Sequence, residues 1–110
     1  MNKEHRVRKN EEFQQIIRCK QSFANSSFVV YYKKNNDHLR VGISVSKKLG
    51  NAVVRNRIKR QVRMMVSSKF EKNKKCDYII IVRNKYLNSS YEENMKQLEY
   101  IYNKINKRME

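Results

Sequence analysis

The feature that most constrains the fold is a short apolar run in the second half of the chain. Residues 76–82 contain Ile79, Ile80 and Ile81 in succession, followed by Val82. A half-exposed strand alternates apolar and polar side chains, so a run that is apolar at consecutive positions is typical of a buried strand. Because the run is far shorter than the ~18 apolar residues of a membrane-spanning helix, we expect a strand in a sheet that helices cover.

Two more strands are predicted upstream of this run. Residues 28–32 are aromatic or β-branched, and residues 39–45 alternate well enough to form a returning strand. Asn35, Asn36 and Asp37 lie between the two segments and are residues that favour turns. The pattern therefore predicts that the two strands pair as an antiparallel hairpin.

Three segments have helical periodicity. The first begins at Asn10, a plausible N-cap, and extends to about residue 20. The longest covers residues 51–70, with Gly50 and Asn51 at its start. A third helix is expected after a serine cap at Ser89 or Ser90. Its apolar stripe comprises Met95, Leu98, Ile101 or Tyr102, and Ile105.

The resulting order is helix, strand, strand, helix, strand, helix, which predicts an α/β (α+β) two-layer sandwich. A chain of 110 residues can form one modest core but not two, so residues 1–110 are expected to be a single domain. Residues 1–9 are basic and have few apolar anchors. We expect them to form a basic N-terminal arm or a loosely held lead-in.

The charge balance points to a polyanionic partner. Lysine and arginine number 26 against 10 acidic residues, which gives a net charge of +16. Such a chain repels itself unless a polyanion binds, and nucleic acid and anionic membrane are the two obvious choices. The chain has no membrane-spanning run, and its first residues lack the apolar core of a secretion signal. A nucleic acid in the cytosol is therefore the favoured partner.

The basic charge is concentrated in one segment. Residues 38–70 contain no acidic residue and nine basic ones: Arg40, Lys47, Lys48, Arg55, Arg57, Lys59, Arg60, Arg63 and Lys69. Arg55, Lys59 and Arg63 recur every four residues, so like charges repel along one stripe of the predicted helix. A different arc of the helix is apolar and is expected to pack on the sheet; it comprises Val54, Ile58, Val62, Met65 and Val66. An external anion is expected to neutralise the basic side.

The junction before this helix resembles a phosphate cradle. Residues 44–51 run from strand into helix and include Lys47 and Lys48. Backbone amides at a helix start, with a positive helix end and nearby lysines, favour phosphate binding. The segment lacks the GxxxxGK[ST] spacing of a P-loop, so ATP binding is not expected.

A second group of residues is aromatic. In a strand over residues 28–32, Val29 and Tyr31 share one face while Phe28, Val30 and Tyr32 share the other. With Phe13 on the preceding helix, one face could form a groove on which unpaired bases stack. Taken alone, the pattern indicates that these aromatic and β-branched residues belong to the core. The surrounding positive charge makes a base-binding groove more plausible, but the core interpretation remains favoured.

Cysteine and histidine show no metal-binding pattern. Cys19 and Cys76 lie far apart, without a CxxC motif, and are expected to be small buried or half-buried side chains. His5 and His38 are isolated in the sequence, so no zinc site can be assembled from sequence neighbours, and His38 is expected to be solvated.

Residues 40–60 resemble the signature of the bacterial ribonuclease P protein, whose hallmark is Arg-Asn-Arg, here Arg55-Asn56-Arg57. The match is long and ungapped. Residues 9–13, 28–31 and 77–81 also look like that family, so the resemblance covers nearly the whole chain. It implies a mixed sheet with a left-handed βαβ crossover, although general rules favour the opposite hand.

The resemblance implies a subunit of the ribonuclease P endoribonuclease, which removes the 5′ leader from precursor tRNA. In that family the RNA carries catalysis with bound Mg²⁺, and the protein helps to bind substrate and metal. The protein alone is then inactive and has no catalytic residue. The implied partners are the catalytic RNA and precursor tRNA, with one protein per RNA, in the cytoplasm and without a membrane.

By position, the resemblance also assigns residues to two sites. RNA binding is assigned to Arg40, Ser46, Lys47, Lys48, Asn51, Arg55, Asn56, Arg57, Lys59, Arg60 and Arg63. A cleft for the single-stranded leader is assigned to Phe13, Ile17, Val29 and Tyr31. Ile17 departs from the family pattern, since relatives often have an aromatic residue there. No metal-binding residue is assigned.

Three rival functions differ in what they require. An intrinsic metal-dependent nuclease needs clustered carboxylates or histidines, and the basic segment has no acidic residue. A nucleoid DNA-binding protein would need a docking motif such as helix-turn-helix, for which the sequence gives no signal. A generic RNA chaperone or ribosome-associated protein could use the same fold and charge. Only the Arg-Asn-Arg signature argues for one structured RNA instead.

Overall fold

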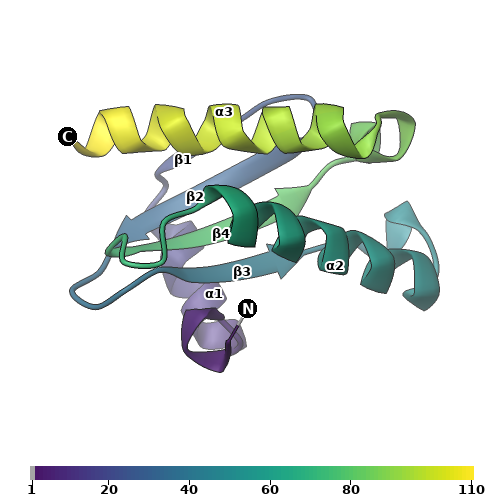
Figure 1. The fold of residues 1–110 in the computed structure, drawn as a ribbon. Helices are drawn as coiled ribbons and strands as arrows, with labels where there is room; N and C mark the ends of the chain where they lie inside the picture. Colours follow the sequence, from purple (N-terminus) through teal and green to yellow (C-terminus); the bar gives the residue numbers. More distant parts are fainter. Residues whose placement is uncertain (1) are drawn as a thin grey trace.

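The computed structural model describes residues 2–110 and places α2 and α3 on one face of a four-stranded sheet, with α1 on the other (Figure 1). Along the chain the elements are η1 (Lys3–His5), α1 (Asn10–Arg18), β1 (Ser22–Ala24), β2 (Phe28–Lys34), β3 (Arg40–Ser44), η2 (Lys47–Leu49), α2 (Ala52–Lys69), β4 (Cys76–Val82), η3 (Asn84–Asn88) and α3 (Tyr91–Met109). The predicted α+β class is confirmed.

The strand β4 lies inside the sheet, as its composition predicts. The strand order is β1-β2-β4-β3, and β4 pairs antiparallel with β2 and parallel with β3. Six of its seven residues are buried, including Ile79 and Ile80, which point to opposite faces. The strand therefore contributes to the core under α2 and α3 and to the smaller core under α1.

The predicted hairpin between residues 28–32 and 39–45 is wrong. Both segments are strands, but β2 pairs with β1 and β4, and β4 separates it from β3. Direct pairing of β2 with β3 would leave β4 at a sheet edge, where one side of its backbone would lack a partner strand. With β4 between β2 and β3, the backbone of the most apolar strand has a hydrogen-bonding partner strand on both sides.

The connection from β3 through α2 to β4 is left-handed. The two strands point the same way in Figure 1, α2 lies in front of the sheet, and β4 lies above β3. Crossovers between parallel strands are right-handed in about 98% of cases, so this arrangement is uncommon. It confirms the crossover that the resemblance implies.

The helices α2 and α3 begin at side-chain caps. Asn51 precedes α2 and accepts a hydrogen bond from the Val54 amide at 3.0 Å. Ser90 caps α3 through a capping box with Glu93, which settles the choice between the two serines. Their buried residues form the main core against the sheet: Ile58, Val62, Met65 and Val66 from α2, and Leu98, Ile101, Tyr102 and Ile105 from α3.

The first helix differs slightly from its prediction. Asn10 is the first helical residue and Lys9 occupies the N-cap position without a side-chain hydrogen bond, so the predicted Asn10 cap is wrong. The helix ends at Arg18, followed by Lys20 at φ 55°. Ile16 is buried against the sheet while Ile17 is only half-buried. This orientation leaves one side of α1 facing a hollow at the sheet.

The predicted N-terminal arm docks on the edge of β3 through Arg6 and Val7, while residues 2–4, 8 and 9 are exposed; residue 1 lies outside the described residues. Arg6 forms a parallel bridge with Val41, and the Val7 amide donates to the Val41 carbonyl at 3.0 Å. The Val7 side chain is 4% exposed. A single apolar anchor and the open edge of β3 thus suffice to dock the arm.

The two histidines reinforce this docking. His5 Nδ1 lies 2.7 Å from the Leu39 carbonyl, His38 Nε2 lies 2.5 Å from the Glu4 carbonyl, and the ring centroids are 4.8 Å apart. The hydrogen bond to Asp37, followed by the bond to Glu4, raises the pKa of His38 above its ordinary value. The His38 side chain is 25% exposed, so its predicted solvation holds in part.

Candidate RNA-binding surface

A cleft separates α1 from one end of the sheet. It has a volume of about 340 Å³ and is lined by Asn10, Phe13, Gln14, Ile17, Ile43, Ser44, Val45, Lys59, Ile79 and Ile81. Phe13 and Ile17 come from successive turns of α1 and face the side chains of β4. The cleft, which we call the α1 cleft, combines six apolar side chains with three uncharged polar ones and a single lysine.

Val29 and Tyr31 share the face of the sheet that carries the α1 cleft. They pair with Ile81 and Ile79 across the β2–β4 ladder, and directly opposed residues point to the same face. Both are half-buried, whereas Phe28, Val30 and Tyr32 are buried on the other face, as the alternation predicts. Neither Val29 nor Tyr31 lines the α1 cleft itself, so the four predicted residues share a face but only two line the hollow.

The basic side of α2 borders this cleft through Lys59. Asn56, Arg57 and Arg60 are exposed, while the stripe of Arg55, Lys59 and Arg63 is half-buried along the helix flank. We call these last three residues the basic stripe. Within residues 2–110 the one ion pair formed by α2 joins Lys69 to Glu99 at 3.6 Å, so the basic stripe has no acidic partner there.

The junction before α2 presents lysines from a rigid turn. Ser46, Lys47 and Lys48 are exposed, while Leu49 is 4% exposed and anchors η2 in the core. Gly50 adopts φ 148°, and a Cβ there would lie 2.9 Å from Val54 Cβ, so only glycine fits without strain. Asn51 is exposed, but its side-chain Oδ1 accepts the hydrogen bond that caps the helix. The turn thus holds both lysines on the side where α2 begins.

Residues 2–110 contain no group of three histidine, cysteine, aspartate or glutamate side chains that could hold a metal ion. Cys76 is buried, and burial raises its pKa to about 11. Cys19 is exposed, so the prediction of a buried or half-buried side chain is wrong for this residue. None of the helices in the described part of the chain is long and apolar enough to cross a membrane.

Comparison with known proteins identifies the family. The model of the family described as Ribonuclease P matches residues 1–106. The chain is 46% identical over 107 residues to the ribonuclease P protein component of Bacillus pumilus, covering 94% of this chain and 90% of that protein. This chain belongs to the ribonuclease P protein family. The resemblance carried by the Arg-Asn-Arg signature is therefore confirmed.

Solved structures of the family agree with this assignment. The Staphylococcus aureus RNase P protein superposes with a TM-score of 0.82 at 40% identity, covering 90% of this chain and 93% of that one. The Thermotoga maritima RNase P protein gives a TM-score of 0.72 at 30% identity, covering 84% and 90% of the two chains. Both the fold and the family support the role of a ribonuclease P protein component.

In this ribonuclease P family member, Arg40 is engaged within the protein. Its guanidinium group forms an ion pair with Glu12 of α1 and lies 3.9 Å from the carboxylate of Asp77. Asp77 is 7% exposed and also accepts a hydrogen bond from Asn35 at 2.7 Å. Arg40 thus links α1 to β3 and β4, an arrangement that favours positioning of the α1 cleft over direct contact with RNA.

Replacing Arg40 by glutamine is expected to destabilise the protein by about 1–3 kcal/mol, because the buried Asp77 carboxylate then lacks a nearby cation. The cost stays below that of a fully buried pair, since the Arg40 side chain is 25% exposed and solvent screens it. Chemical unfolding measures the stability, and RNA binding across a salt series measures the contact. A reduced salt dependence of RNA binding would instead assign Arg40 to the RNA.

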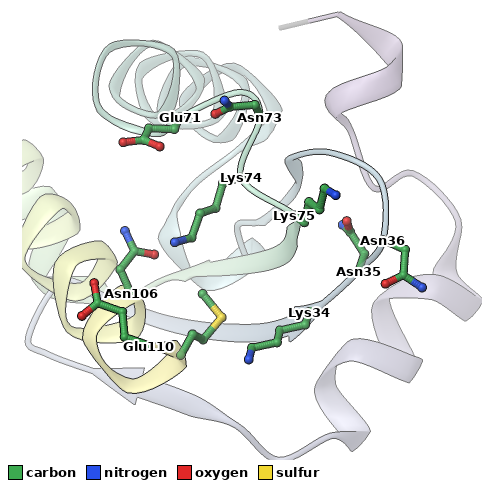
Figure 2. Close-up of a pocket in the computed structure, with 10 residues that line it drawn as sticks. Lys34, Asn35, Asn36, Glu71, Asn73, Lys74, Lys75, Asn106 and Glu110 are labelled. Carbon is green, nitrogen blue, oxygen red and sulfur yellow. The ribbon is translucent and has the colours of Figure 1, made fainter.

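A second hollow lies at the other end of the sheet and has a different character. Figure 2 shows Lys34 and Lys75 on one side of it and Asn106 and Glu110, from the end of α3, on the other. Its lining mixes lysines with the carboxylates of Glu71 and Glu110, and its volume is about 500 Å³. With both signs of charge and no aromatic side chain in its lining, it suits nucleic acid less well than the α1 cleft.

Proposed function

We propose that this protein binds the catalytic RNA of ribonuclease P and the 5′ leader of precursor tRNA, and so assists removal of the leader. The observation that carries the proposal is the position of Lys59, which belongs to the basic stripe of α2 and also lines the α1 cleft. One surface therefore offers apolar contacts for bases and cations for phosphates. Single-stranded nucleic acid is bound through this combination, with little reading of sequence.

The two parts of the surface have separate tasks in this proposal. The ring of Phe13, with Ile17 and the β4 isoleucines, contacts leader bases in the α1 cleft, while Val29 and Tyr31 extend the same face across β2. The basic and polar residues of the junction before α2 and of α2 itself dock the protein on the catalytic RNA through its phosphates. They are Ser46, Lys47, Lys48, Asn51, Arg55, Asn56, Arg57, Lys59, Arg60 and Arg63.

Catalysis is assigned to the RNA and not to this chain. The side chains of residues 2–110 do not by themselves provide a cluster that fits a metal ion, so the proposal places Mg²⁺ on the RNA and on the RNA–protein complex. Neutralising phosphates with arginine and lysine reduces the Mg²⁺ concentration that RNA folding and substrate binding require. We propose one protein per RNA, acting in the cytoplasm.

The test is cleavage of precursor tRNA at low Mg²⁺ by a bacterial ribonuclease P RNA, with and without this protein, and by the protein alone. We expect cleavage at the mature 5′ end only when RNA and protein are combined. Cleavage by the protein alone would contradict the assignment of catalysis to the RNA.

The rival function is that of a general RNA chaperone, and the same assay separates it. A chaperone would bind the ribonuclease P RNA, and unrelated structured RNAs with similar affinity, without restoring cleavage at low Mg²⁺. Restored cleavage by this protein, and not by an unrelated basic protein of similar charge, supports the subunit role.

A further inference from the structure

Three arginines converge where the N-terminal residues meet α2. They border a hollow of about 570 Å³, lined by Arg6, Arg60, Arg63, Met64, Ser67 and Ser68. Arg6 and Arg63 lie 57 positions apart in the sequence, and the docking of residues 6–7 on β3 brings them together. We call this hollow the arginine pocket.

The arginine pocket carries positive charge that the described protein does not compensate. Within residues 2–110 none of its three guanidinium groups forms an ion pair with a carboxylate. The Nε atom of Arg6 is buried and has no hydrogen-bond partner in that part of the chain. Burial, followed by the nearby charge of Arg6, lowers the pKa of Arg63 below its ordinary value. The folded state therefore holds like charges together at a cost in free energy.

The two elements that carry the arginines are anchored to the sheet without a ligand. The bridge between Arg6 and Val41 and the burial of Val7 hold the backbone of the N-terminal residues on β3. Arg60 and Arg63 are held by α2, which packs on the sheet through Ile58 and Val62. Because both elements are anchored, the fold sets the backbone positions from which the three arginine side chains reach the same hollow.

We propose that Arg6, Arg60 and Arg63 form a phosphate site for the backbone of an RNA partner, built jointly by the N-terminal residues and α2. Guanidinium forks match phosphate oxygens in a bidentate geometry. Ser67 and Ser68 line the same hollow and carry hydroxyl groups that can donate further hydrogen bonds. A bound phosphate removes the mutual repulsion of the arginines. The inference rests on the proposed function, since it requires an RNA partner.

The position of the site continues the RNA-binding surface. Lys59 at the α1 cleft precedes Arg63 by one helical turn, which corresponds to about 6 Å along the axis. An RNA strand that contacts Lys59 can therefore place a neighbouring phosphate in the arginine pocket. The N-terminal residues then contribute directly to RNA binding through Arg6.

The test compares Arg6→Met with Arg8→Met in full-length protein that binds ribonuclease P RNA. Both variants lose one positive charge, but Arg8 is exposed and does not line the arginine pocket, which makes it a matched control. Methionine retains much of the aliphatic stem of Arg6. We expect Arg6→Met to weaken binding about five- to eightfold at ~0.1 M salt and to lower the salt slope by about 0.7–0.9. Arg8→Met should change both quantities less.

Two further variants make the result specific. Arg63→Met tests the same site from α2 and is decisive if Arg6→Met fails to fold. The double variant Arg6→Met/Arg63→Met should lose less affinity than the product of the two single losses, because both side chains contact one phosphate. Equal effects of Arg6→Met and Arg8→Met, or strictly multiplicative losses in the double variant, would overturn the shared site.

The phosphate can come from the catalytic RNA or from the leader, and the experiment separates these sources. A loss in binding to ribonuclease P RNA without substrate assigns it to the catalytic RNA. A loss that appears only with precursor tRNA, and grows with leader length, assigns it to the leader. If the wild-type protein neither binds these RNAs nor restores cleavage, the proposed function fails together with the site. If the wild type does both and Arg6→Met behaves like Arg8→Met, only the site fails.

Discussion

Replacing the basic stripe by glutamine, in the triple variant Arg55→Gln/Lys59→Gln/Arg63→Gln, is expected to weaken binding to ribonuclease P RNA about 100- to 500-fold at ~0.1 M salt. The figure follows from three phosphate contacts, each of which lowers the salt slope by about 0.7–0.9 when it is lost. The total slope should therefore fall by about 2 to 3. Filter binding or fluorescence anisotropy across a salt series measures both quantities.

The same variant should remain folded. Its three residues repeat at intervals of four, so each replaced pair relieves a like-charge repulsion of about 0.2–0.5 kcal/mol. The buried face of α2, formed by Ile58, Val62, Met65 and Val66, is unchanged. Circular dichroism and thermal unfolding without RNA check this expectation, and a large loss of stability would show that the stripe holds the fold together.

A control variant separates the effect of losing the basic stripe from the effect of lowering the net charge. Replacing Lys96, Lys104 and Lys107 by glutamine removes the same charge from exposed positions on α3. Those positions lie on a different element from the basic stripe, so the slope should fall by much less. Equal losses in the two triple variants would mean that overall charge, and not the arrangement on α2, determines RNA binding.

Local patterns in the sequence predict the elements but not their neighbours in the sheet. The strand over residues 76–82 is predicted with its observed bounds, because a short run of consecutive isoleucines in a small protein is most readily buried as an interior strand. The pairing of β2 with β4 depends on burial of a strand more than forty residues away, so the turn at Asn35–Asp37 suggested a hairpin that does not form. The strand Ser22–Ala24 has too few residues to show an alternation.

Part of the candidate site can be predicted from local sequence patterns, and part depends on contacts between distant segments. The basic stripe can be predicted because its residues lie on one helix, where spacing alone determines which side chains share a face. Spacing in the sequence could not identify Arg6, since its proximity to Arg63 depends on how the edge of β3 accepts the N-terminal residues. The contribution of Ile79 to the α1 cleft was missed for a similar reason, because a buried strand gives no sign of which helix covers each face.

Replacing Gly42 by alanine is expected to reduce the preference of the holoenzyme for precursor tRNA over mature tRNA. Gly42 lies on β3 opposite Ile79, and a Cβ at this position would lie 2.5 Å from Cζ of Phe13 and 2.9 Å from Cδ1 of Ile79. The backbone angles do not require glycine here, so the requirement is one of space. The added methyl group must displace the Phe13 ring, which lines the α1 cleft.

The displacement has two measurable consequences. Overpacking should lower the free energy of unfolding by about 1–3 kcal/mol, measured by chemical unfolding. Loss of one stacked leader base costs about 1–3 kcal/mol, so the affinity for precursor tRNA should fall about 5- to 150-fold while the affinity for mature tRNA stays unchanged. Binding of the protein to ribonuclease P RNA should keep its salt slope, because no cation is removed.

The double variant Gly42→Ala/Phe13→Leu separates stability from binding. Leucine lacks the Cζ and Cε1 atoms of phenylalanine that the new methyl group would meet. The clash is therefore relieved, and most of the stability should return. The leader contact should stay weak, because leucine offers no aromatic face for a base to stack on. If the double variant regained full preference for precursor tRNA, apolar contact alone would hold the leader. If Gly42→Ala destabilised the protein without changing that preference, the α1 cleft would not be the leader site.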